Sequence, residues 1–108
     1  MVKKTDFSEM TAWYVLNSPE IGKPFSDFYK ACDKDGVLDK KTRELVMLTV
    51  ASIFQSLDGT ESHIKAALEA GVSREEITEA LLIAAAEGAN TQLSWAKEIY
   101  QKYLGNGA

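Results

Sequence analysis

The spacing of apolar residues is helical along almost the whole chain, and this periodicity constrains the fold more than any other feature. Apolar side chains recur three or four positions apart, and no strand-like alternation persists for long. Only two prolines occur, Pro19 and Pro24, and both lie in the N-terminal quarter. We therefore predict an all-α fold, a compact bundle of about five to six helices that forms a single domain over residues 1–108.

Local signals divide the N-terminal third into two expected helices. A short amphipathic helix is expected over about 7–17. Ser18 followed by Pro19 is typical of an N-cap with proline at the first helical position. The helix that they open should run to about Cys32, and its inner side is expected to carry Phe25, Phe28 and Tyr29.

Asp39 is expected to cap a third helix, over about 40–56. Apolar residues cover most of the circumference of this helix, so neighbours should bury it on several sides. Its first turn carries Lys40, Lys41 and Arg43 beside acidic residues, a pattern that favours a solvated helix start over an anion site.

Two capping boxes are expected further along the chain. Asp58 with Glu61 should open one helix, and Gly71 should end it. Ser73 with Glu76 should open the next helix in the same way.

Gly88 is expected to break or bend the chain before a last helix that runs past Leu93 to about Leu104. Several of the expected helices are apolar on most sides, which leaves surplus apolar surface in so small a chain. We therefore expect the chain to self-associate into a homo-oligomer.

Composition excludes several classes of function. The net charge of −4 and the absence of a basic face argue against nucleic-acid binding. No apolar run is long enough to span a bilayer, and the first residues have no apolar stretch typical of a signal peptide. We therefore expect a cytoplasmic protein without membrane contact.

The chain has one cysteine, Cys32, and one histidine, His63. A single cysteine permits neither a disulfide nor a thiol relay within the chain, and Cys32 is expected to be a half-buried small side chain rather than a reactive thiol. One histidine and one cysteine are also too few for a zinc site, so no metal is expected.

The stretch over 39–88 resembles the core of the carboxymuconolactone decarboxylase and alkylhydroperoxidase D superfamily. The resemblance rests on the helix opening DKKTREL, on the block HIKAALEAG and on the segment SREEITEAL. It covers about half the chain and implies an alkylhydroperoxidase D-like helical fold, assembled into trimers or hexamers.

In the alkylhydroperoxidase branch, this core carries a glutamate, a Cys-x-x-Cys pair and a histidine, which match Glu44, positions 56 and 59, and His63. Ser56 and Gly59 stand where the two cysteines would be. Because peroxide reduction of that type needs a thiolate and a resolving thiol, thiol peroxidase activity is not expected.

The decarboxylase branch also lacks the cysteine pair and needs no cofactor. The resemblance therefore implies a cofactor-free acid–base enzyme for a small organic acid or lactone, with His63 as general acid/base and Glu44 as its orienting partner. Ser56 and Asp58 would contact the substrate. The segment Leu57-Asp58-Gly59-Thr60 departs from that branch's Trp-Glu-Glu-Phe type, so the lactone itself stays open, and the alternative is a non-catalytic oligomeric binding or scaffold protein that keeps the fold.

Overall fold

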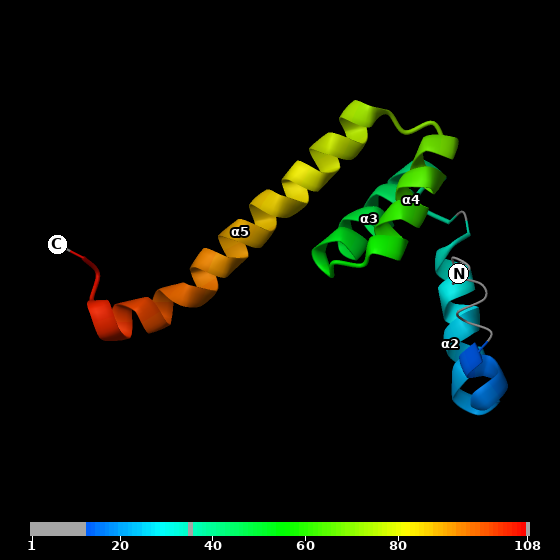
Figure 1. Cartoon of the computed structure of the whole chain (residues 1–108), viewed down its shortest axis with the longest axis horizontal. Helices are drawn as coiled ribbons and strands as arrows, with labels where there is room; N and C mark the ends of the chain where they lie inside the picture. Colours follow the sequence, from blue (N-terminus) through cyan, green and yellow to red (C-terminus); the bar gives the residue numbers. More distant parts are fainter. Residues whose placement is uncertain (1–12, 35, 108) are drawn as a thin grey trace, which may run out of the picture. The chain divides into compact units, whose positions relative to one another are not determined.

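The computed structural model describes residues 13–34 and 36–107, and within them every regular element is a helix. The helices are α2 (Pro19–Cys32), α3 (Lys40–Ile53), α4 (Leu57–Glu69) and α5 (Arg74–Leu104) (Figure 1). A short helical stretch over 13–17 precedes α2, and the rest of the first expected helix lies outside the described residues. The prediction of an all-α fold is confirmed. None of the described helices is both long and apolar enough to cross a membrane.

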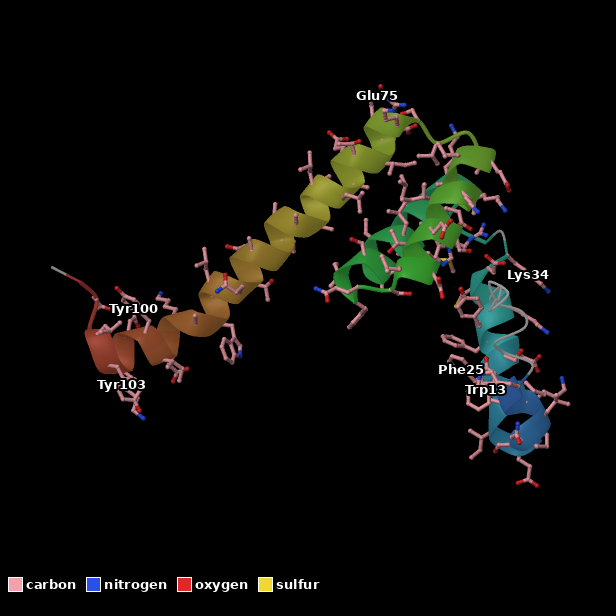
Figure 2. All side chains as sticks on the ribbon, viewed as in Figure 1. Trp13, Phe25, Lys34, Glu75, Tyr100 and Tyr103 are labelled. Atoms are coloured by element: carbon pink, nitrogen blue, oxygen red, sulfur yellow. The ribbon has the colours of Figure 1, made fainter. Side chains whose placement is uncertain are left out.

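The chain divides after Arg43 into two units. In the first unit, the stretch over 13–17 packs against α2 through Tyr14, whose ring meets that of Phe25 edge to face at a centroid distance of 5.5 Å. Gly22 lies at this crossing, where an added Cβ would come within 2.7 Å of the Tyr14 carbonyl oxygen. Figure 2 labels Trp13 and Phe25 in this cluster.

The expectation that the aromatic residues of α2 face inward is wrong for Phe25 and Phe28, which are exposed. The buried positions of α2 are instead Gly22 and Ser26. At Gly22 the close approach of the preceding stretch leaves no room for a side chain. Cys32, at the end of α2, is also exposed rather than half-buried.

Arg43 corrects the prediction of a fully solvated start to α3. Its side chain is buried, and its guanidinium donates from Nη1 to the Asp33 carbonyl oxygen at 2.8 Å, whereas Lys40 and Lys41 are exposed as expected. Asp39 caps α3 as predicted, because its Oδ1 accepts a hydrogen bond from the Thr42 amide at 2.8 Å.

The hydrogen bond from the Thr42 amide holds the pKa of the Asp39 carboxyl below its usual range, and the Thr42 side chain, Lys41 and Arg43 act in the same direction. Since the lowered pKa belongs to the folded state, this cap stabilises the fold above the ordinary carboxyl pKa of about 3.9, and its contribution is lost as the pH falls through the lower, folded-state value. An Asp39→Ala variant should therefore be less stable than the parent near neutral pH, and the gap should close in strong acid. Urea unfolding at a series of pH values measures it.

Asp39→Asn is the matched control, because asparagine keeps the capping acceptor and does not titrate. The gap between the Asn and Ala variants should stay constant over the same pH range. A gap between parent and Ala variant that stays equally constant into strong acid would show that the Asp39 carboxylate contributes nothing through its charge.

In the second unit, α3 and α4 form a hairpin whose turn is closed by backbone hydrogen bonds. The Ser56 amide bonds the Ala51 carbonyl and the Gln55 amide bonds that of Ser52, with Gln55 at a positive φ of 58°. This is the Schellman pattern for ending a helix, and it reverses the chain within three residues of Ile53.

Ser56, and not Asp58, caps α4. Its side chain accepts from the Gly59 amide at 3.1 Å, and the helix begins at Leu57. The prediction that Asp58 is the cap is wrong because the Schellman turn leaves Ser56 with the extended backbone that a cap requires. Asp58 lies instead in the first turn, where an acidic side chain suits the positive end of the helix.

The turn from α4 to α5 follows the prediction. Gly71 ends α4 at a positive φ of 90°, and Ser73 and Glu76 form the expected capping box, with hydrogen bonds of 3.0 and 2.8 Å. The buried apolar core of this unit lies around that turn, and partly buried neighbours pack against it. The core consists of Leu48, Ala67, Val72 and Ile77, and the neighbours are Leu45, Ile64 and Leu81.

The predicted break at Gly88 is wrong, because α5 runs without interruption from Arg74 to Leu104 (Figure 1). A glycine inside a helix costs only about 1 kcal/mol relative to alanine. The alanines on both sides of Gly88 favour the helix strongly enough to offset that cost.

Gly88→Ala is therefore expected to raise the free energy of unfolding by about 0.5–1 kcal/mol. An added Cβ at this position meets no atom within 4 Å, so the gain in helix propensity carries no steric cost. Gly59→Ala is the contrasting variant, because its Cβ would lie 2.8 Å from Ser56 Oγ and should lower stability. Urea unfolding compares the two, and a destabilising Gly88→Ala would contradict the account of α5.

Candidate functional site

The hairpin of α3 and α4 brings Glu44 and His63 together. Along α3, Glu44, Leu48 and Ala51 recur at helical spacing, and along α4 so do Gly59 and His63. Glu44 meets His63 near one end of the hairpin, and Ala51 lies against Gly59 near the turn. The two helices run side by side in opposite directions (Figure 1).

His63 Nδ1 lies 2.8 Å from Glu44 Oε2. The side chain of Glu44 is only 3% exposed and that of His63 is 15% exposed. The predicted pairing is thus present in the structure, as a short contact that is largely withdrawn from solvent.

This contact determines the chemistry of the two ring nitrogens. An ionised carboxylate can only accept hydrogen bonds, so Nδ1 carries the hydrogen and donates it to Glu44. In the neutral ring, Nε2 is then the basic nitrogen, and in the charged ring Nε2 carries the proton that can be given away.

The position one turn further along each helix is a buried core residue. Leu48 follows Glu44 by four positions and Ala67 follows His63 by four, and neither exposes any surface. The hydrogen bond to Glu44 orients the imidazole.

Among the described residues, neither Ser56 nor Asp58 forms a hydrogen bond with His63. Ser56 lies two helical turns before His63 on the same side of α4, about 10 Å along the axis, and its Oγ is engaged by the Gly59 amide. Asp58 is exposed and lies on a different side of the helix from His63. A substrate-contacting role for either residue stays a prediction.

Gly59 has a role that sequence reasoning missed. An added Cβ at this position would come within 3.2 Å of the Ala51 Cβ, so the absence of a side chain lets α3 and α4 approach closely. The available signal was a glycine in the first turn of a helix, at a position that is neither a cap nor a helix end. Among residues 13–34 and 36–107, no group of three or more His, Cys, Asp or Glu side chains is placed to hold a metal ion.

Comparison with known proteins places the chain in a family. The model of the "Carboxymuconolactone decarboxylase family" matches residues 19–102. A relative from Paracoccus denitrificans, "Uncharacterized protein 4 in cox locus", is 37% identical over 68 residues, which cover 59% of this chain and 61% of the relative. The chain thus spans about three fifths of that relative's length. Because the family match covers most of the sequence, the resemblance expected from the motifs is confirmed, and the chain belongs to the carboxymuconolactone decarboxylase family.

Proposed function

We propose that this chain is a cofactor-free acid–base enzyme that acts on a small organic acid or lactone. The observation that carries the proposal is the buried contact of 2.8 Å between His63 Nδ1 and Glu44 Oε2. It supports a division of roles in which Glu44 orients the imidazole and Nε2 of His63 exchanges a proton with the substrate.

The reaction that fits the family and this pair is decarboxylation beside a carbonyl group. As the bond between carbon and carboxylate breaks, CO2 leaves and its electron pair passes to the carbon, where the neighbouring carbonyl delocalises it as an enolate. The charged His63 then gives its Nε2 proton to that carbon, and the new C–H bond completes the product. The ring recovers its proton from water, so one proton is consumed for each CO2 released.

Glu44 keeps the imidazole oriented between turnovers, because its Oε2 lies within hydrogen-bond distance of Nδ1. Ser56 could contribute a hydrogen bond to the substrate, since its hydroxyl hydrogen is not used by the cap. Asp58 would add polarity at the same end of α4.

Thiol peroxidase activity is not proposed. Ser56 and Gly59 occupy the positions that carry the cysteine pair in the alkylhydroperoxidase branch, and neither can form and resolve a sulfenic acid. The sole cysteine, Cys32, belongs to α2 and has no second thiol in the chain.

The test is release of CO2, with deuterium incorporation at carbon from D2O, across a panel of β-keto acids and carboxylated γ-lactones. The parent should accelerate at least one member, and His63→Gln should reduce that rate at least about a hundredfold, because general acid–base groups contribute on the order of 10²–10⁴. Glu44→Gln should reduce it less, since the amide keeps an acceptor but loses the charge. Glu69→Gln, an exposed change on α4, is the matched control and should have no effect.

A parent protein with no activity on the panel, or a His63→Gln variant as active as the parent, would contradict the proposal. In that case the non-catalytic scaffold would be the better description of the chain.

A further inference from the structure

The first turn of α4 ends at a hydroxyl group that the fold leaves unused. Thr60 is partly buried, and among the described residues its side chain forms no hydrogen bond. The hydroxyls of Thr49 and Thr78, by contrast, each donate to a backbone carbonyl of the preceding turn at 2.8 Å. Such a bond is the usual partner of a threonine inside a helix. Its absence at Thr60 leaves one donor and two acceptor positions available.

The Thr60 hydroxyl also remains accessible from outside. Among the described residues, the one fully buried side-chain oxygen or nitrogen without a partner is the hydroxyl oxygen of Tyr14. The unpartnered oxygen of Thr60 therefore keeps accessible surface, although the residue as a whole is partly buried. A ligand can bind this hydroxyl without first breaking a hydrogen bond inside the protein.

Helix geometry places Thr60 beside the imidazole. Residues three apart on a helix are neighbours on its surface, with Cβ atoms about 5–6 Å apart. Helical side chains lean toward the N-terminus of their helix, so the imidazole of His63 leans over the turn that contains Gly59 and Thr60. Gly59 has no side chain, and Ser56 lies one turn further away with its Oγ engaged by the Gly59 amide. On this side of α4, Thr60 is therefore the polar side chain closest to His63.

The side of α4 that carries Thr60 is otherwise apolar. Leu57 and Ile64 lie three positions before and four positions after Thr60, and Ile64 packs against the core. The nearest acidic residues of α4, Asp58 and Glu61, are exposed on other sides of the helix. No carboxylate of α4 thus lies on this side to repel an anion at Thr60, and the apolar neighbours strengthen any hydrogen bond made there.

We infer that the Thr60 hydroxyl donates a hydrogen bond to the carbonyl oxygen of the substrate beside His63. This inference rests on the proposed function and deepens it. As CO2 leaves, the electron pair of the broken bond passes toward that oxygen as the enolate forms, so the hydrogen bond strengthens in the transition state. The oxygen and the carbon that receives the proton from His63 are separated by one atom, which suits two groups on neighbouring positions of one helix.

Malonate is the probe for this contact. It has the carbon skeleton of a β-keto acid, and its second carboxylate carries negative charge where the enolate oxygen would carry it. Binding is followed by the ¹H and ¹⁵N shifts of His63, which is the only histidine. The measurement needs no turnover, so its result does not depend on whether the chain decarboxylates anything.

Thr60→Val removes the hydroxyl and keeps the shape of the side chain, whereas Thr60→Ser keeps the hydroxyl. Thr60→Val should weaken malonate binding at least about tenfold, because a hydrogen bond to a charged group is lost, while Thr60→Ser should bind within about twofold of the parent. Thr49→Val is the matched control, since it removes a hydroxyl that is engaged within α3, and it should bind malonate like the parent. A parent that does not bind malonate, or a Thr60→Val variant that binds it equally well, would overturn the inference.

Kinetics add a second readout for any acid that the parent decarboxylates. Thr60→Val should lower kcat at least about tenfold and change KM by less than about twofold, because the hydrogen bond strengthens only in the transition state. Thr60→Ser should restore kcat, and a Thr60→Val variant with the kcat of the parent would refute the role of Thr60. Malonate binding that needs the Thr60 hydroxyl, in a protein that decarboxylates no acid of the panel, would support Thr60 as the anion-binding residue beside His63 and contradict only the proposed reaction.

Discussion

Replacing His63 with leucine is expected to lower the free energy of unfolding by about 3 kcal/mol. The substitution keeps the volume of the side chain but leaves the carboxylate of Glu44, which is almost completely buried, without its partner. An unpaired buried charge keeps the full cost of its desolvation. Urea unfolding at a fixed protein concentration measures the loss.

A double-mutant cycle shows whether this loss belongs to the pair. Glu44→Leu removes the charge and the acceptor, and the double variant Glu44→Leu/His63→Leu replaces both polar groups by apolar ones. The double variant should be more stable than the sum of the two single losses predicts, by at least about 1 kcal/mol. Strictly additive losses would mean that the 2.8 Å contact contributes no coupling energy.

Leu48→Ala should also destabilise the chain strongly, by about 2–5 kcal/mol. Leu48 exposes none of its surface and belongs to the small core of the second unit, so its truncation leaves a cavity that few neighbours can fill. Because it lies one turn beyond Glu44 on α3, the cavity should also loosen the support of the acid–base pair.

Leu68→Ala is the matched control for this prediction, because it is the same chemical change at a side chain that is 54% exposed. It should cost about 1 kcal/mol, in proportion to the smaller apolar area that is buried. Equal losses for the two variants would mean that the buried core around Leu48 is not the main source of stability in this unit.

Much of the fold followed from local signals in the sequence. Asp39 and the pair Ser73 and Glu76 were recognised as caps because their side chains satisfy backbone groups within three residues, which depends on local sequence alone. The sequence predicts Asp58 rather than Ser56 as the cap of α4, because the Schellman turn that frees Ser56 depends on the positive φ of Gln55, which is unusual for glutamine. Gly88 alone predicts a break, but the strong helix formers around it offset its cost and α5 continues.

The pairing of Glu44 with His63 was expected from the family resemblance and their separation along the chain. The nitrogen that makes the contact could not be predicted, since it depends on the side-chain rotamers of the folded protein. The sequence does not predict the burial of Arg43 either. Its guanidinium donates to the backbone carbonyl of Asp33, and only the folded loop brings that carbonyl within reach.

The most direct test of the account is the tautomer of His63, read from one-bond and long-range ¹H–¹⁵N correlations of the imidazole. His63 is the only histidine, so its signals need no assignment. We expect the neutral ring to carry its hydrogen on Nδ1, with Nε2 unprotonated, and we expect Glu44→Leu to abolish this preference. A neutral ring protonated on Nε2, or a spectrum that Glu44→Leu leaves unchanged, would contradict the role of Glu44 as the residue that orients His63 for acid–base chemistry.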